Sequence, residues 1–230
     1  MKKFGFLFAL IALFELLAVY YSWRFEWLEF VSKPLILLSL IGFLVISTKG
    51  VSCKFKNIII AALFFSWMGD MFLMIDDYYP TLFIFGLASF LISHLLYIFG
   101  FLQSAHPPLD IPLIRKHPWI IFFLIVFGSY VFKTIEPGLG NMVIPVVVYL
   151  AAILSMFVFA LNRWGKVNFN SFLWISIGAS FFIISDSILA FNKFHDQIDN
   201  AHLYTMATYM FAQYSIVRGA YLQILETEKN

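Results

Sequence analysis

Charged residues are scarce in this sequence. Asp, Glu, Lys and Arg make up 12% of the 230 residues, whereas hydrophobic residues make up 62%. About a quarter of the residues in a soluble domain are charged, so half of that share excludes an ordinary soluble globular protein. The net charge of +2 gives no indication of a nucleic-acid partner. The single cysteine, Cys53, excludes an intramolecular disulfide and a cysteine-based metal site.

The sequence also lacks the motifs of several hydrolase classes. It contains no His-x-x-x-His pair, no Gly-x-Ser-x-Gly word and no Walker loop. Ser185 and Ser187 flank Asp186, but adjacency in sequence does not build a catalytic triad. We therefore expect no metal site, no cofactor and no serine nucleophile.

Long apolar runs separated by short polar loops fill the chain. Helices satisfy their own backbone hydrogen bonds in lipid, so the pattern predicts an all-α, polytopic transmembrane bundle forming a single domain over 1–230. Residues do not alternate between apolar and polar as in a transmembrane β-barrel. The predicted spans are 4–21, 31–47, 57–75, 81–103, 118–133, 141–161, 171–191 and 202–222. The second and fifth are short and are expected to extend into the interface.

The basic residues are distributed unevenly between the loops. One side carries Lys2, Lys3, Lys49, Lys54, Lys56, Arg115, Lys116, Arg163, Lys166 and Lys229, and the other carries Arg24, Lys33, Lys133 and Lys193. The positive-inside rule then places both termini in the cytoplasm, which agrees with an even number of spans. The expected location is the inner membrane of a bacterium.

Two aspartates interrupt the predicted spans. Asp70 lies in AALFFSWMGDMFLMI and Asp186 in SIGASFFIISDSILAF, both in the outer half of the membrane by this topology. A carboxylate at membrane depth costs at least ~2.5–3.5 kcal/mol on insertion scales. Each carboxyl group could simply hydrogen-bond to neighbouring helices and stabilise the bundle. Two at one depth favour a functional pair, with one protonated as a general acid and its neighbour ionised.

Further polar residues lie at a similar depth. Lys33 opens the second span with Pro34 at its first helical position, and Tyr209 and Gln213 follow one face of the last span. The two aspartates, Lys33 and Tyr209 could line one cavity. Lys33 could equally be an interfacial anchor rather than a phosphate-binding group. Tyr209 and Gln213 could equally be polar contacts between helices.

His94 and Tyr97 lie one turn apart on the fourth span. His94 fits a buried core histidine as well as a site residue. The words around Asp70 and Asp186 are 116 residues apart, and the same offset relates Tyr97 to Gln213. This spacing fits two parallel repeats of four helices, but apolar sequences also match at such an offset by chance.

Several short words occur in order along most of the chain. They are KP at 33–34, WMGD at 67–70, FG at 85–86, HLLY at 94–97, SDSILA at 185–190 and AQ at 212–213. Together they resemble the YhhN-like membrane protein family, the lysoplasmalogenases. The resemblance implies hydrolysis of the vinyl ether bond of lysoplasmalogens to a fatty aldehyde and glycerophosphoethanolamine or glycerophosphocholine. It attributes activity to the two aspartates, here Asp70 and Asp186.

The resemblance also names the expected partners, a lysophospholipid substrate and the lipid bilayer. We expect Lys33, His94, Tyr97, Tyr209 and Gln213 to bind or surround the substrate. The main alternative is a proton-coupled secondary transporter, because buried Asp and His residues also form proton relays. A metal-dependent lipid hydrolase using His94 and a structural membrane protein are further alternatives. The sequence does not determine the headgroup, the oligomeric state or which aspartate is the acid.

Overall fold

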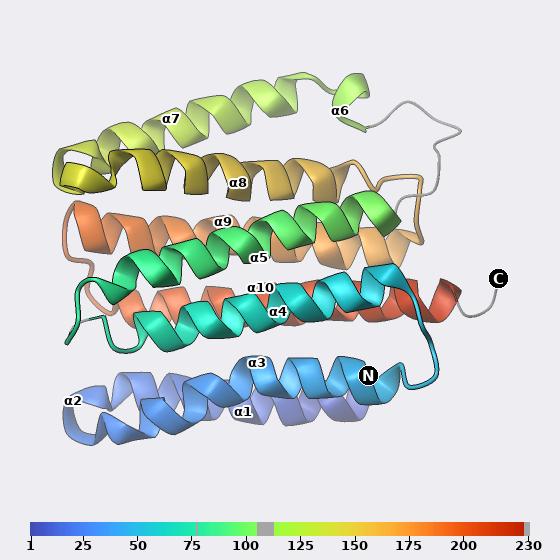
Figure 1. Cartoon of the computed structure of the whole chain (residues 1–230), viewed down its shortest axis with the longest axis horizontal. Coiled ribbons are helices and arrows are strands. Elements are labelled where there is room, and N and C mark those ends of the chain that lie inside the picture. Colours follow the sequence, from blue (N-terminus) through green and yellow to red (C-terminus); the bar gives the residue numbers. More distant parts are fainter. Residues whose placement is uncertain (77, 105–112, 228–230) are drawn as a thin grey trace.

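The described residues of the chain form a bundle with eight long helices (Figure 1). The computed structural model describes residues 1–76, 78–104 and 113–227, without the side chains of Lys2 and Trp23. The long helices are α1 (Lys2–Tyr20), α3 (Trp27–Ser47), α4 (Lys54–Leu73), α5 (Leu82–Ser104), α7 (Trp119–Leu139), α8 (Val143–Leu161), α9 (Phe169–Phe194) and α10 (Ala201–Thr227). Shorter elements are α2 (Ser22–Phe25), α6 (Leu113–Lys116) and the 3-10 turn η1 (Gly140–Met142). The predicted all-α class and the eight helices are confirmed.

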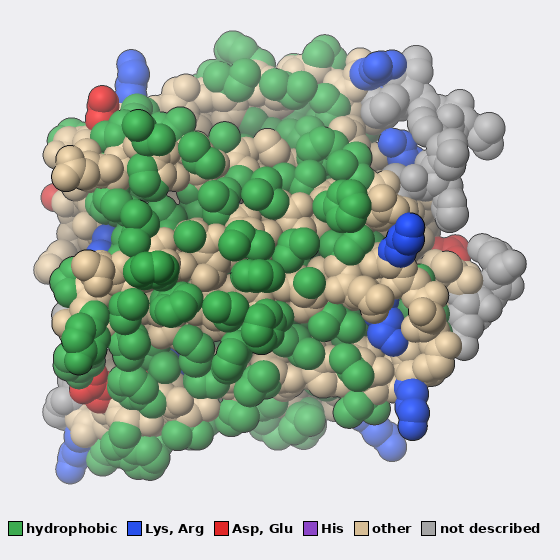
Figure 2. All heavy atoms as spheres, in the orientation of Figure 1, with side chains coloured by type: hydrophobic (Ala, Val, Ile, Leu, Met, Phe, Trp, Pro, Cys, Tyr) green, Lys and Arg blue, Asp and Glu red, His purple; other side chains and the backbone are tan. Residues whose placement is uncertain are grey.

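The outer surface of the bundle is apolar. Figure 2 shows hydrophobic side chains over the middle of one face, with most charged side chains toward its two ends. Phe123 is 60% exposed and Ile144 is 76% exposed, which suits contact with lipid rather than water. Six segments are long and apolar enough to cross a membrane, and one of them, Trp119–Leu161, contains both α7 and α8. The protein is therefore a multi-pass integral membrane protein.

The second predicted span starts too late. Helix α3 begins at Trp27, so Pro34 lies inside the helix and its predicted place at the first helical position is wrong. The additional turns include Glu29, whose carboxylate pairs with Lys33 four residues later. Such an i, i+4 ion pair stabilises a helix, which explains why the helix includes these polar residues. Helix α7 likewise extends beyond the predicted 118–133, to Leu139.

Consecutive long helices run antiparallel, and the start of α1 and the end of α10 lie at the same end of the bundle (Figure 1). This agrees with the predicted even number of spans. The side chain of Lys2 and the whole of Lys229, both counted in the charge pattern, lie outside the described residues. Which end faces the cytoplasm stays a prediction.

Two helix pairs form the centre of the bundle: α4 packs on α5, and α9 packs on α10. The second pair approaches closely at a glycine, since a Cβ added to Gly178 would lie 2.7 Å from the carbonyl oxygen of Ala212. An offset of 116 residues carries α4 (54–73) onto 170–189 in α9, and it carries α5 (82–104) onto 198–220, of which 201–220 lie in α10. The same offset carries α1 onto α7 and α3 onto α8, so the helix order agrees with the suggested repeat.

Candidate active site

A cavity of about 520 Å³ lies at the end of the bundle opposite the start of α1 and the end of α10. Its wall is formed by residues of α3, α4, α5, α7, α8, α9 and α10. The volume falls within the range of about 300–1,000 Å³ typical of small-molecule sites. Asp70 and Asp186 both line it, although 116 residues separate them in the chain.

Asp70 lies near the end of α4 and is 3% exposed. Its Oδ2 accepts a hydrogen bond of 2.9 Å from the hydroxyl of Tyr209 on α10. The Gln213 amide donates to that hydroxyl at 3.3 Å, and the Tyr97 hydroxyl donates to Gln213 Oε1 at 2.7 Å. These four residues, the Asp70 network, connect α5 through α10 to the carboxyl group on α4. Each hydrogen bond in this series is donated in the direction of Asp70, so the network holds the carboxyl group in one orientation.

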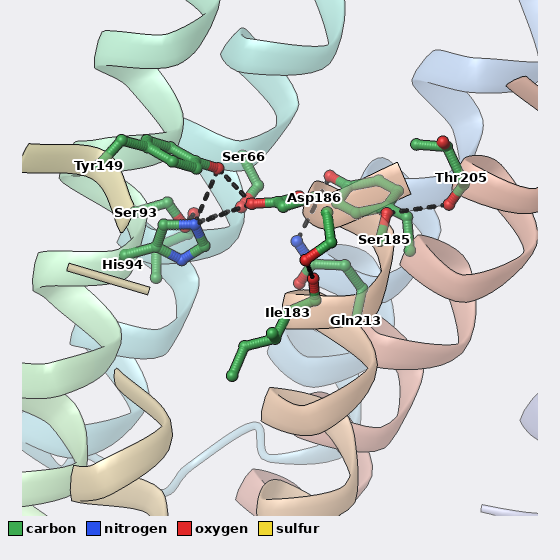
Figure 3. A network of polar contacts seen from close by, with 12 residues as sticks. Ser66, Ser93, His94, Tyr149, Ile183, Ser185, Asp186, Thr205 and Gln213 are labelled. Carbon is green, nitrogen blue, oxygen red and sulfur yellow. Dashed lines mark hydrogen bonds and ion pairs between the residues drawn. The ribbon is translucent and has the colours of Figure 1, made fainter. Parts of the chain in front are cut away.

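Asp186 lies in the second half of α9 and has a different set of partners (Figure 3). The Tyr149 hydroxyl on α8 donates to Asp186 Oδ2 at 2.5 Å. His94 Nε2 on α5 lies 3.0 Å from the Tyr149 hydroxyl and 3.6 Å from Asp186 Oδ2. Since the tyrosine proton is directed at Asp186, the tyrosine oxygen is free to accept from His94, which places a proton on Nε2. We call these three residues the Asp186 network.

One aromatic ring contacts both networks. The Phe182 ring lies 5.0 Å from that of His94 and 5.5 Å from that of Tyr209, in edge-on geometry in both cases. Phe182 is fully buried. It excludes water from behind the two networks and keeps their tyrosine and histidine rings in place.

Ion pairs surround the polar side of the cavity. Lys33 Nζ lies 3.4 Å from Glu29 Oε1, and His202 Nε2 lies 3.1 Å from the same oxygen. Lys193 pairs with Asp76 at 2.7 Å. All five residues line the cavity, so both signs of charge are present at its polar side.

The structure places the predicted site residues in and directly behind this cavity. Asp70, Asp186, Lys33 and Tyr209 line it. His94, Tyr97 and Gln213 belong to the two networks but are fully buried behind the wall. They therefore do not reach the cavity themselves, contrary to the predicted contact with substrate. His94 contacts Tyr149 and Gln213 contacts Tyr209, both of which line it, while Tyr97 reaches Tyr209 through Gln213.

The sequence interpretation missed several members of the site. Tyr149 stands alone in the run VVVYLAA, where the only signal was a single hydroxyl among apolar residues. The ion-pair partners Glu29, Asp76, Lys193 and His202 lie at helix ends or in loops, where charged residues are expected anyway. Only the fold brings them to one cavity.

The part of the chain that the structure describes contains no cluster of side chains suited to bind a metal ion. No three His, Cys, Asp or Glu side chains gather there closely enough to hold a metal ion. The alternative of a metal-dependent hydrolase built on His94 gains no support from this arrangement.

Comparison with known proteins gives the family. The model described as the YhhN family matches residues 28–220, a segment that contains both networks. The chain belongs to the YhhN family. Among curated relatives it is similar to human lysoplasmalogenase TMEM86B, with 31% identity over 86% of this chain and 77% of the human protein.

Two further relatives carry the same activity in their names. The pig lysoplasmalogenase TMEM86B is 30% identical over 82% of this chain and 73% of its own length. A Mycobacterium tuberculosis lysoplasmalogenase is 30% identical over 59% of this chain and 49% of its own length. No solved structure matches this YhhN family chain.

Proposed function

We propose that this protein is a lysoplasmalogenase-like hydrolase that cleaves the vinyl ether bond of lysoplasmalogens. The products would be a fatty aldehyde and glycerophosphoethanolamine or glycerophosphocholine. The observation that carries the proposal is the presence of two carboxyl groups, Asp70 and Asp186, on the wall of one cavity, each bound by a tyrosine hydroxyl. The names of the family relatives supply the substrate class.

The chemistry needs an acid, an anion and water. A protonated carboxyl group donates its proton to the β-carbon of the vinyl ether, and the electrons of the double bond form the new C–H bond. The α-carbon and ether oxygen then share a positive charge, which the second carboxylate stabilises, much as in glycosidases. Water adds to the α-carbon and loses a proton to a carboxylate. A carboxylate takes the proton of the resulting hemiacetal's hydroxyl group, the C=O of the aldehyde forms as the C–O bond to glycerol breaks, and a carboxyl group returns a proton to the glycerol oxygen.

The contacts favour Asp186 as the anion. Each carboxyl group accepts one hydrogen bond from a tyrosine hydroxyl, but the Asp186 side chain is 16% exposed and has His94 Nε2 3.6 Å from its Oδ2, whereas Asp70 is 3% exposed. Burial disfavours the ionised form of a carboxyl group. Asp70 is accordingly the proton donor, and Asp186 stabilises the cation and orients water.

The ion pairs suit the headgroup of such a lipid. Lys33 offers a point charge for the phosphate, and Glu29 beside it matches the ammonium of ethanolamine or choline. His94, Tyr97, Tyr209 and Gln213 act as positioning residues for the two carboxyl groups. No step requires a metal or another cofactor.

Aldehyde release from a lysoplasmalogen by purified protein tests the proposal. We expect Asp70→Asn and Asp186→Asn each to lower kcat by at least about 10²-fold, the typical contribution of acid–base catalysis. Asp199→Asn, which removes an exposed carboxylate from the α9–α10 loop, serves as the matched control. Full activity of either cavity variant would refute the assignment of the pair.

The transporter alternative has its own outcome in the same preparation. Reconstituted protein that moves a lysolipid or a proton across vesicles, without forming aldehyde, would replace the hydrolase proposal. Residence in a bacterial inner membrane with cytoplasmic termini remains part of the proposal.

A further inference from the structure

The wall of the cavity has a charged side at α3 and α10 and an apolar side at α7, α8 and α9, although Lys193 near the end of α9 also brings charge to the wall. The ion pairs of Lys33, Glu29 and His202 come from α3 and α10. The apolar side comes from α7, α8 and α9 and includes Val131, Ile135, Val146, Ile153 and Ile183. A site with this division fits a ligand that has a charged head and an apolar chain.

The apolar side has its own cluster of side chains. Val131 and Ile135 of α7 pack with Val146 of α8 in a hydrophobic cluster, which Leu87 of α5 and Ala190 of α9 flank. All five residues line the cavity. The cluster faces the ligand space rather than the main core, which is a separate cluster of residues.

Asp186 lies among apolar cavity-lining residues of α9. On α9, its carboxyl group lies one turn from Ile183 and one turn from Ala190, and all three line the cavity. A bond to be cleaved at Asp186 would have the charged head on the α3 and α10 side. The remainder of the molecule would then extend along α7 and α8.

We propose that the wall formed by Val131, Ile135 and Val146 binds the aliphatic chain of a single-chain lipid and sets the preferred chain length. This inference rests on the proposed function for the identity of the lipid. A cavity of about 520 Å³ suits one chain with its headgroup rather than a two-chain phospholipid. Burial of the chain supplies binding energy, and its fixed path places the vinyl ether bond at the carboxyl pair.

Neighbouring valines on α8 allow a matched test. Val146 is 7% exposed and lines the cavity, whereas Val147 is 44% exposed on another face of the same helix. Phenylalanine at 146 would fill the space of the chain, while phenylalanine at 147 would face lipid. The two variants carry the same change at adjacent positions.

We would measure lipid binding and lysoplasmalogen turnover by the full chain in nanodiscs. The binding probes are saturated alkyl-ether lysophosphoethanolamines with a long or a short chain, which lack the cleavable double bond. We expect Val146→Phe to weaken binding of the long-chain probe by about tenfold or more relative to the short-chain probe, the scale of a few displaced methylenes in an apolar pocket. Val147→Phe should leave both affinities unchanged. In turnover of the corresponding lysoplasmalogens, kcat/KM should show the same selective loss.

The two proposals fail in different ways. Equal affinities of Val146→Phe and Val147→Phe for the long-chain probe would overturn the chain site. So would an equal loss for long and short chains, as expected for a general folding defect. A selective loss of long-chain binding with no aldehyde from wild-type protein would support the chain site and overturn the hydrolase function. Ile135→Ala offers an independent check, because enlarging the groove should favour longer chains.

Discussion

At the residue scale, the two aspartates differ in their hydrogen-bond partners rather than in their local sequence. Both accept from a tyrosine hydroxyl, but only Asp186 has a histidine nitrogen beside the same oxygen. The Nδ1 of His94 has no hydrogen-bond partner among the described residues. The other ring nitrogen, Nε2, contacts the Tyr149–Asp186 pair. This contact favours a role for His94 in positioning that pair over a role as an ordinary buried core residue.

Tyr149→Phe tests this role. The variant keeps the ring and removes the hydroxyl that donates to Asp186 Oδ2. A hydrogen bond to a charged group contributes about 1.5–3 kcal/mol, so kcat should fall by about 10- to 100-fold with little change in KM. Tyr130→Phe removes a hydroxyl from the exposed face of α7 and is the control. Unchanged kcat in Tyr149→Phe would contradict the role of this hydroxyl.

At the scale of elements, the close approach of α9 and α10 positions both networks. Helix α9 carries Asp186, and α10 carries Tyr209 and Gln213. Ser185 on α9 also donates to the backbone carbonyl of Thr205 on α10 at 3.0 Å. The contact at Gly178 lets the two backbones approach, as small residues do in membrane helix pairs.

Gly178→Ala should therefore destabilise the protein. Its Cβ would lie 2.7 Å from the Ala212 carbonyl oxygen, and backbone shifts of this kind cost about 1–3 kcal/mol. Gly42→Ala on α3 is the matched control, since no atom lies within 4 Å of the added Cβ. It should be neutral or slightly stabilising, because alanine favours a helix interior over glycine. Thermal unfolding in detergent measures both, and equal stability of the two variants would contradict the packing argument.

At the scale of the whole molecule, the first four long helices and the last four long helices of the described residues meet at the cavity. The aspartate of each half is contacted by a helix of the other half: Asp70 on α4 by Tyr209 on α10, and Asp186 on α9 by His94 on α5. Tyr97 and Gln213, which the offset of 116 relates, hydrogen-bond to each other. Two equivalent residues related by a two-fold axis contact each other when they lie next to that axis. The Tyr97–Gln213 contact therefore agrees with two repeats related by a two-fold axis that runs along the bundle.

The orientation of the bundle gives the remaining prediction. In a Cys53→Ser background, Lys49→Cys labels the exposed α3–α4 connection and Asp199→Cys the exposed α9–α10 loop. With cytoplasmic termini, a membrane-impermeant thiol reagent should modify position 199 in intact cells and position 49 only after permeabilisation. The reverse pattern would invert the topology and place the cavity on the cytoplasmic side.

Hydropathy and charge along the sequence were enough to predict the all-α class and the helices, and they indicated Asp70 and Asp186 as candidate site residues. These predictions follow from hydropathy and from the cost of burying charge, which are properties of single residues and short segments. The sequence could not identify Tyr149, or the pairing of Lys33 with Glu29, because such contacts depend on which helices become neighbours. That both carboxyl groups line one cavity, with a charged and an apolar side, follows from the tertiary structure alone. Helix packing, not local sequence, brings residues 116 positions apart to the same wall.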